Sequence, residues 1–224
     1  MSDLFSQLKL AIPDRYELER LLGSGGMATV YLARDRQQGR RVAIKLLRPE
    51  LAGAVGQDRF LREIRIASEL THPHIVPLLD SGRVTLAGDS IPYYVMPYID
   101  GESLRDRLLR EKQLPIEDTV AIARDIAAAL NHAHQHGIIH RDIKPENILL
   151  AGLAALVADF GIARAIDRSA DPEVLTTRGI AIGTAAYMSP EQSSAQAELD
   201  GRTDLYSLGC VVYEMLGGDP PFSG

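Results

Sequence analysis

The chain has 224 residues, 46% hydrophobic and 24% charged, a balance typical of a globular protein with a core of its own. Its net charge of −6 argues against a general nucleic-acid binder, which needs a positive surface to meet phosphates. A single cysteine, Cys210, excludes an intramolecular disulfide framework.

No signal peptide is visible at the N-terminus, and the longest apolar run, residues 148–158, is too short to span a bilayer. We therefore expect this part of the protein to be cytoplasmic, whether or not the full-length parent is anchored in a membrane.

The first half of the chain is predicted to be rich in strands. Loosely spaced apolar residues in 1–12 indicate a short helix that Pro13 stops. Strands are predicted from Tyr16, around 30–32, around 42–44 after a turn at 37–40, and near 75–79 and 93–96. Apolar positions at helical spacing predict an amphipathic helix over 58–70.

The second half is predicted to be mainly helical. Ser103 is the predicted N-cap of a short helix that ends near Arg110, and Gly137 the predicted stop of a long helix over 117–136. Residues 203–216 form a third helix that is apolar nearly all round, which is typical of a helix in the middle of a protein. A small β-rich lobe is thus followed by a helical lobe, joined near 97–101.

A glycine cluster separates the first two predicted strands. Gly23, Gly25 and Ala28 loosely match a dinucleotide fingerprint, but that motif opens a helix, whereas residues 29–32 read as a strand. A Walker loop is excluded because no Lys-Ser or Lys-Thr follows. A glycine loop between two strands can lay its backbone N–H groups over nucleotide phosphates, and a plain hairpin turn is the alternative that the loop alone leaves open.

Lys45 ends the apolar stretch Val42-Ala43-Ile44 and favours the nucleotide interpretation. Under the glycine loop, its ammonium would pair with the α and β phosphates. Glu63 lies on the inward side of the predicted helix and is the candidate to hold Lys45, because an acid beside a core stripe is costly to bury unpaired.

Two further motifs indicate a resemblance to a known family. Residues 140–147 read His-Arg-Asp-Ile-Lys-Pro-Glu-Asn, and Asp159-Phe160-Gly161 follows two apolar runs that predict a hairpin. With Lys45 and the glycine loop, this chain resembles the protein kinases, in their bacterial form, from about Tyr16 to its last residue. The resemblance implies an α+β, bilobal fold with an N-terminal extension (1–13), an antiparallel β-rich lobe with one helix (14–98) and an incomplete, mainly helical lobe (99–224).

The resemblance also implies a function, transfer of the γ-phosphoryl group of ATP to serine and threonine hydroxyls of proteins with Mg²⁺. In the family's roles, Asp142 accepts the proton of the substrate hydroxyl, Lys144 lies beside the γ-phosphate, and Asn147 and Asp159 bind the metal. Lys144 followed by Pro145 resembles serine/threonine kinases rather than tyrosine kinases. The nucleotide-binding residues implied are Leu22, Gly23, Ser24, Gly25, Gly26, Met27, Ala28, Thr29, Val30, Ala43, Lys45, Glu63, Met96, Pro97, Ile99, Leu149 and Asp159.

Among these, Met96 is the implied gatekeeper beside adenine. The carbonyl of Pro97 and the N–H of Ile99 are the implied hinge contacts. The adenine ring is expected between Val30 and Ala43 on one side and Leu149 on the other.

Residues 159–191 are the implied regulatory segment. Thr176 and Thr177 are its expected autophosphorylation sites, with Arg141 and Arg164 as partners of the phosphate. A second copy of the chain is the expected partner for autophosphorylation in trans.

The main alternative function is an inactive nucleotide-binding or scaffold fragment, because helices that follow in the family are missing after residue 216. A small-molecule phosphotransferase is disfavoured by Lys144-Pro145 combined with Ser189-Pro190-Glu191. His132, His134 and His136 suggest a metal site, but no acid at a useful spacing completes it.

Overall fold

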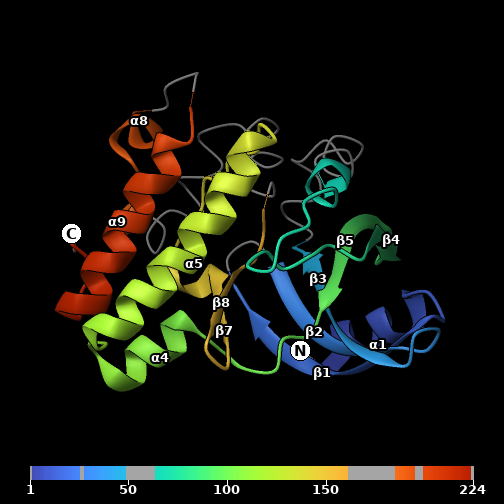
Figure 1. The fold of residues 1–224 in the computed structure, drawn as a ribbon. Helices are drawn as coiled ribbons and strands as arrows, with labels where there is room; N and C mark the ends of the chain where they lie inside the picture. The colour runs from blue at the N-terminus through green and yellow to red at the C-terminus, as the bar shows by residue number, and fades with distance from the viewer. Residues whose placement is uncertain (1, 26–27, 49–63, 161–184, 195–198, 223–224) are drawn as a thin grey trace.

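The computed structural model describes residues 2–25, 28–48, 64–160, 185–194 and 199–222. An antiparallel five-stranded sheet lies at one end of the molecule and the long helices lie at the other (Figure 1). Residues 98–101 connect the two parts after strand β5 (Asp89–Pro97). This is the bilobal α+β arrangement that the sequence predicted.

The strands of the sheet follow the order β1-β2-β3-β5-β4. Side chains alternate between the two faces of a strand, so neighbouring residues of β5 enter different cores. On one face, Tyr93 belongs to the core that also includes Leu8 of helix α1 (Ser2–Ala11), whereas Tyr94 and Met96 belong to the core on the face toward the helical lobe. The other strands are β1 (Tyr16–Ser24), β2 (Ala28–Asp35), β3 (Arg40–Leu47) and β4 (Asp80–Leu86).

The prediction of a strand over 75–79 is wrong, because strand β4 begins only at Asp80. Residues 74–76 pair instead with Val157 of the helical lobe: Val76 N–H donates to its carbonyl and its N–H donates to His74, both at 2.9 Å. Pro77 then interrupts the segment, because proline has no N–H to donate to a sheet. Of the predicted helix 58–70, residues 64–67 are helical and 58–63 lie outside the described residues.

The helical lobe follows the predicted signals closely. Ser103 caps α4 (Leu104–Glu111) in a reciprocal capping box with Asp106. Helix α5 (Ile116–Gln135) is followed by Gly137 at φ +70°, a conformation that glycine adopts without strain. The remaining elements are β6 (Glu102–Ser103), η1 (Pro145–Asn147), β7 (Ile148–Ala151), β8 (Ala154–Val157), η2 (Ala185–Tyr187), α8 (Pro190–Ser193) and α9 (Arg202–Gly217).

Helices α5 and α9 run side by side and form the core of this lobe (Figure 1). Leu130 of α5 and Val211 of α9 are fully buried there. The opposite side of α9 exposes Leu205, Tyr213 and Leu216, so the helix is not covered on all sides. In the described ranges no helix is both long and apolar enough to cross a membrane.

Candidate active site

The side chains predicted to act in catalysis contact one another in the loop before β7. Lys144 Nζ lies 2.7 Å from Asp142 Oδ2. Asn147 Nδ2 donates to the same carboxylate oxygen (3.0 Å) and to the backbone carbonyl of Asp142 (2.8 Å). Because these bonds occupy the side-chain nitrogen Nδ2, the side-chain oxygen Oδ1 of Asn147 is the atom left to meet a cation.

The buried carboxylate of Asp204 lies beneath this loop and holds its backbone. This aspartate of α9 is 0% exposed and accepts from the N–H groups of His140 and Arg141, both at 2.8 Å. His134 Nε2 of α5 donates to it as well, at 2.7 Å. The loop therefore rests on both main helices of the lobe.

Asp159 is held from the sheet. Its Oδ2 accepts from Lys45 Nζ of β3, and its Oδ1 accepts from the Tyr94 hydroxyl of β5 at 2.6 Å. Burial by itself raises the pKa of Asp159, but the Lys45 ammonium, the Tyr94 hydrogen bond and the neighbouring His140 outweigh burial and hold that pKa below its usual range. The group is therefore an ionised carboxylate at neutral pH.

His140 connects Asp159 with the predicted catalytic loop, residues 140–147, of which it is the first residue. Its Nε2 donates to the carbonyl of Ala158 (2.8 Å), and its ring packs edge-on against Phe160 with the centroids 4.6 Å apart. Ala158 N–H in turn donates to the carbonyl of Asn147 (2.9 Å). The residues on either side of Asp159 are thus anchored to the loop that carries Asn147.

Asp159 and Asn147 supply the kind of ligands that Mg²⁺ prefers. An ionised carboxylate and an amide oxygen are hard donors, and the hydrogen bonds above orient both of them. The residues present therefore fit a magnesium ion.

Six of the residues expected to bind the nucleotide belong to one apolar cluster between the sheet and β7. Ala43 and Met96 are buried, at 5% and 8% exposure, while the other four of these six are half-buried and keep an accessible apolar surface. Tyr98 N–H donates to the Arg41 carbonyl at 3.4 Å where the sheet ends, one residue before Ile99. The four half-buried residues of this set are Leu22, Val30, Ile99 and Leu149.

The glycine loop lies between two strands and opens no helix, in agreement with the predicted strand–loop–strand arrangement. Gly23 and Ser24 end β1, Gly25 N–H donates to the Ala28 carbonyl at 2.9 Å, and Thr29 pairs with Ser24. Several predicted residues lie outside the described residues: Gly26, Met27, Glu63, Arg164, Thr176 and Thr177.

Sequence reasoning missed two groups beside the site. One is the Tyr94 hydroxyl. The other is Arg105 of α4, which donates to Glu146 of the catalytic loop (2.8 Å) and to buried Glu214 of α9 (2.6 Å). Tyr187 of η2 also donates to Glu214, so this network joins the loop to the segment before α8. The contacts join residues far apart in the chain, and only the alternation of β5, which puts Tyr94 on the Met96 face, was a usable signal.

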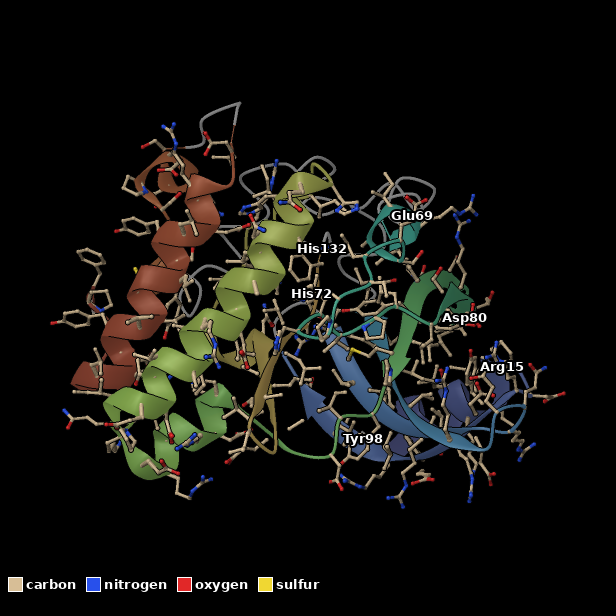
Figure 2. All side chains as sticks on the ribbon, viewed as in Figure 1. Arg15, Glu69, His72, Asp80, Tyr98 and His132 are labelled. Atoms are coloured by element: carbon tan, nitrogen blue, oxygen red, sulfur yellow. The ribbon has the colours of Figure 1, made fainter. Side chains whose placement is uncertain are left out.

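The three histidines before residue 140 do not all converge on one point: the rings of His132 and His136 lie 4.5 Å apart, but His134 is directed elsewhere. His134 is committed to Asp204, and His132 stacks on His72 with the ring centroids 5.2 Å apart (Figure 2). Within the described part of the chain, no three His, Cys, Asp or Glu side chains are arranged to hold a metal ion.

Comparison with known proteins identifies the family. Residues 16–224 match the family described as protein kinase domain, and the chain belongs to it. It is 47% identical over 215 residues to the serine/threonine-protein kinase PknB of Mycobacterium leprae and 46% identical over 215 residues to PknB of Mycobacterium tuberculosis. Each alignment covers 95% of this chain and 34% of the relative, so the chain spans about a third of the length of these proteins.

A solved structure agrees with this assignment. The crystal structure of the Mycobacterium tuberculosis PknI kinase domain superposes with a TM-score of 0.75 at 31% sequence identity. The match covers 95% of this chain and 78% of that domain.

Proposed function

We propose that this chain is an ATP-dependent protein kinase that phosphorylates serine and threonine residues. The observation that carries the proposal is the contact between Asp142, Lys144 and Asn147, next to a carboxylate, Asp159, that is paired with Lys45. Phosphoryl transfer needs positioned groups and charge compensation more than covalent help from the protein, and this arrangement supplies both. The names of the curated relatives support the same activity.

ATP would bind between the lobes. The half-buried apolar surfaces of Val30 and Leu149 suit the faces of a flat base, and Pro97 keeps the carbonyl that an adenine amino group requires. Lys45 lies opposite Val30 in the sheet, so its ammonium comes from the strand beside the glycine loop. We assign it to the α and β phosphates.

Bound Mg²⁺ would neutralise phosphate charge and fix the orientation of the triphosphate, with Asn147 and Asp159 as its protein ligands. Asp142 accepts the proton of the substrate hydroxyl as the hydroxyl oxygen attacks the γ-phosphorus and ADP leaves. Lys144, 2.7 Å from Asp142, compensates negative charge on the transferred group.

Regulation by autophosphorylation of Thr176, Thr177 or both is part of the proposal. Arg141 directly precedes the proposed catalytic aspartate, and with Arg164 it would bind the phosphate. Phosphopeptide mapping of an active preparation tests this part, and finding neither threonine modified contradicts it.

The decisive test of the activity uses radiolabelled ATP, Mg²⁺ and a generic basic protein, with Asp142→Asn in parallel. The proposal predicts labelled phosphoserine or phosphothreonine with the wild-type chain and almost none with the variant. Nucleotide binding without transfer by the wild-type chain would support the inactive scaffold instead. Transfer that Asp142→Asn leaves unchanged would refute the catalytic assignment.

A further inference from the structure

Tyr94 is a fully buried residue whose polar end lies in the proposed active site. It is 1% exposed and occupies the face of β5 that also carries Met96. Its hydroxyl donates a 2.6 Å hydrogen bond to Asp159 Oδ1. A phenylalanine would fill the same apolar volume, so packing alone does not explain the hydroxyl.

The sheet presents two donors to one carboxylate. Lys45 of β3 and Tyr94 of β5 stand directly opposite each other in the antiparallel register, so their side chains project side by side. Lys45 contacts Oδ2 and Tyr94 contacts Oδ1. The rotation of the Asp159 carboxylate is therefore determined at both of its oxygens.

The contact between Tyr94 and Asp159 is of a strong kind. A phenol O–H donates to a carboxylate oxygen at 2.6 Å. Hydrogen bonds to a carboxylate are shorter and stronger than those between neutral groups.

The backbone of Asp159 also needs outside support. Its φ angle is +71°, a left-handed conformation that is uncommon for residues other than glycine. Such conformations persist where the surroundings over-determine them, and they gather at functional sites. Two side-chain donors from rigid strands provide that support here.

A carboxylate with these two donors still has room for a metal. Its two oxygens offer about four lone-pair positions. Lys45 and Tyr94 each occupy one, so one position on each oxygen stays available. Donors in this outer layer fix the orientation of a ligand, and their loss typically lowers metal affinity or activity by about 10- to 100-fold.

We propose, on the basis of the function proposed above, that Tyr94 is a positioning residue that orients the Asp159 carboxylate for the divalent cation. This role requires no contact of Tyr94 with the nucleotide or with the transferred group. Its action passes through Asp159, so its loss changes the metal requirement more than the maximal rate.

The test compares Tyr94→Phe with a matched control, Tyr93→Phe. Tyr93 is the adjacent buried tyrosine, 4% exposed, and it packs on the opposite face of the sheet. Mn²⁺ is titrated into each chain with a non-hydrolysable ATP analogue, and free Mn²⁺ is followed by electron paramagnetic resonance. Thermal melting of both variants is measured first, to establish that each is folded at the assay temperature.

Tyr94→Phe is expected to weaken Mn²⁺ binding by about 10-fold, while Tyr93→Phe leaves it unchanged. The Mg²⁺ concentration for half-maximal phosphoryl transfer rises in parallel, and the rate recovers at saturating Mg²⁺. Affinity for the analogue without metal stays at the wild-type value. A substitution that only disturbed packing would weaken binding with and without metal alike.

Equal or tighter Mn²⁺ binding by Tyr94→Phe, with a wild-type chain that transfers phosphate, overturns this inference and leaves the proposed function intact. A wild-type chain that neither binds Mn²⁺ with the analogue nor transfers phosphate overturns both.

Discussion

The catalytic loop and Asp159 belong to the same candidate site, but different kinds of contact hold them. The loop is held through its backbone: Asp204 accepts hydrogen bonds from two consecutive N–H groups, and His134 of another helix donates a hydrogen bond to Asp204. Asp159 is fastened by side chains of the sheet, Lys45 and Tyr94. We infer that the loop keeps its geometry without ligands, whereas the position of Asp159 depends on how the two lobes meet.

Removing the support of the loop should have the largest effect on stability. Asp204→Ala leaves two buried N–H groups and the His134 ring without their acceptor. At about 1–3 kcal/mol for each unsatisfied buried group, we expect a loss of about 3 kcal/mol or more in the free energy of unfolding, measured by urea denaturation. Asp125→Ala removes the acceptor of one backbone N–H, that of Ala155, and should cost clearly less. Equal losses would contradict the special role of Asp204.

Breaking the contact between the lobes comes next. Lys45→Met leaves the Asp159 charge without its cation, and we expect a loss of about 2 kcal/mol. This is less than for a fully buried pair, because the two side chains are 20% and 12% exposed.

Arg36→Met is the control for Lys45→Met. It breaks the exposed pair between Arg36 and Glu17, whose atoms are 3.4 Å apart, and should cost below about 1 kcal/mol. If the two substitutions cost the same in urea denaturation, the lobes do not meet through Asp159 as described.

A smaller loss of stability is expected from removing the contact between His134 and Asp204 beneath the loop. His134→Ala removes one donor to Asp204 but leaves both backbone bonds in place, so we expect a loss of about 1 kcal/mol and nearly unchanged nucleotide affinity. Calorimetric melting and nucleotide titration measure the two quantities. A loss as large as that of Asp204→Ala would mean that the helix contact, rather than the backbone contact, holds the loop.

The smallest expected effect is a dependence on pH at a second contact between the lobes. Burial, followed by the neighbouring His132 and His74, lowers the pKa of His72. Because the unfolded chain then binds the proton more readily, stability should fall as pH drops below the ordinary value of 6.5. Two other titratable groups lie beside this cluster: His136, whose ring centroid is 4.5 Å from that of His132, and Asp125, 3.5 Å from His74.

His132→Asn tests the origin of that dependence. Removing one neighbouring imidazole should reduce the loss of stability between pH 7.5 and 5.5, measured by urea denaturation at each pH. An unchanged loss would assign the effect to other groups.

The contrast between the two regions also explains what sequence reasoning achieved. The catalytic loop was predicted as a unit because its functional residues are contiguous, from His140 to Asn147. Local signals likewise predicted the cap at Ser103 and the stop at Gly137, because each acts within one turn of its helix.

Contacts between distant residues were not predictable in this way. Tyr94 lies 65 positions from Asp159, and Arg105 lies 109 positions from Glu214. The strand predicted over 75–79 failed for the same reason, since its backbone pairs with Val157 of the other lobe. Alternation identifies the face of a strand, but the partner on that face emerges only from the fold.

We assign nucleotide binding to Lys45 and phosphoryl transfer to Asp142. The most direct test measures both activities side by side in Asp142→Asn and Lys45→Met. We predict that Asp142→Asn binds ATP like the wild-type chain and loses transfer by about 10²- to 10⁴-fold, while Lys45→Met loses both. Loss of ATP binding in Asp142→Asn, or wild-type binding and transfer in Lys45→Met, would contradict the account.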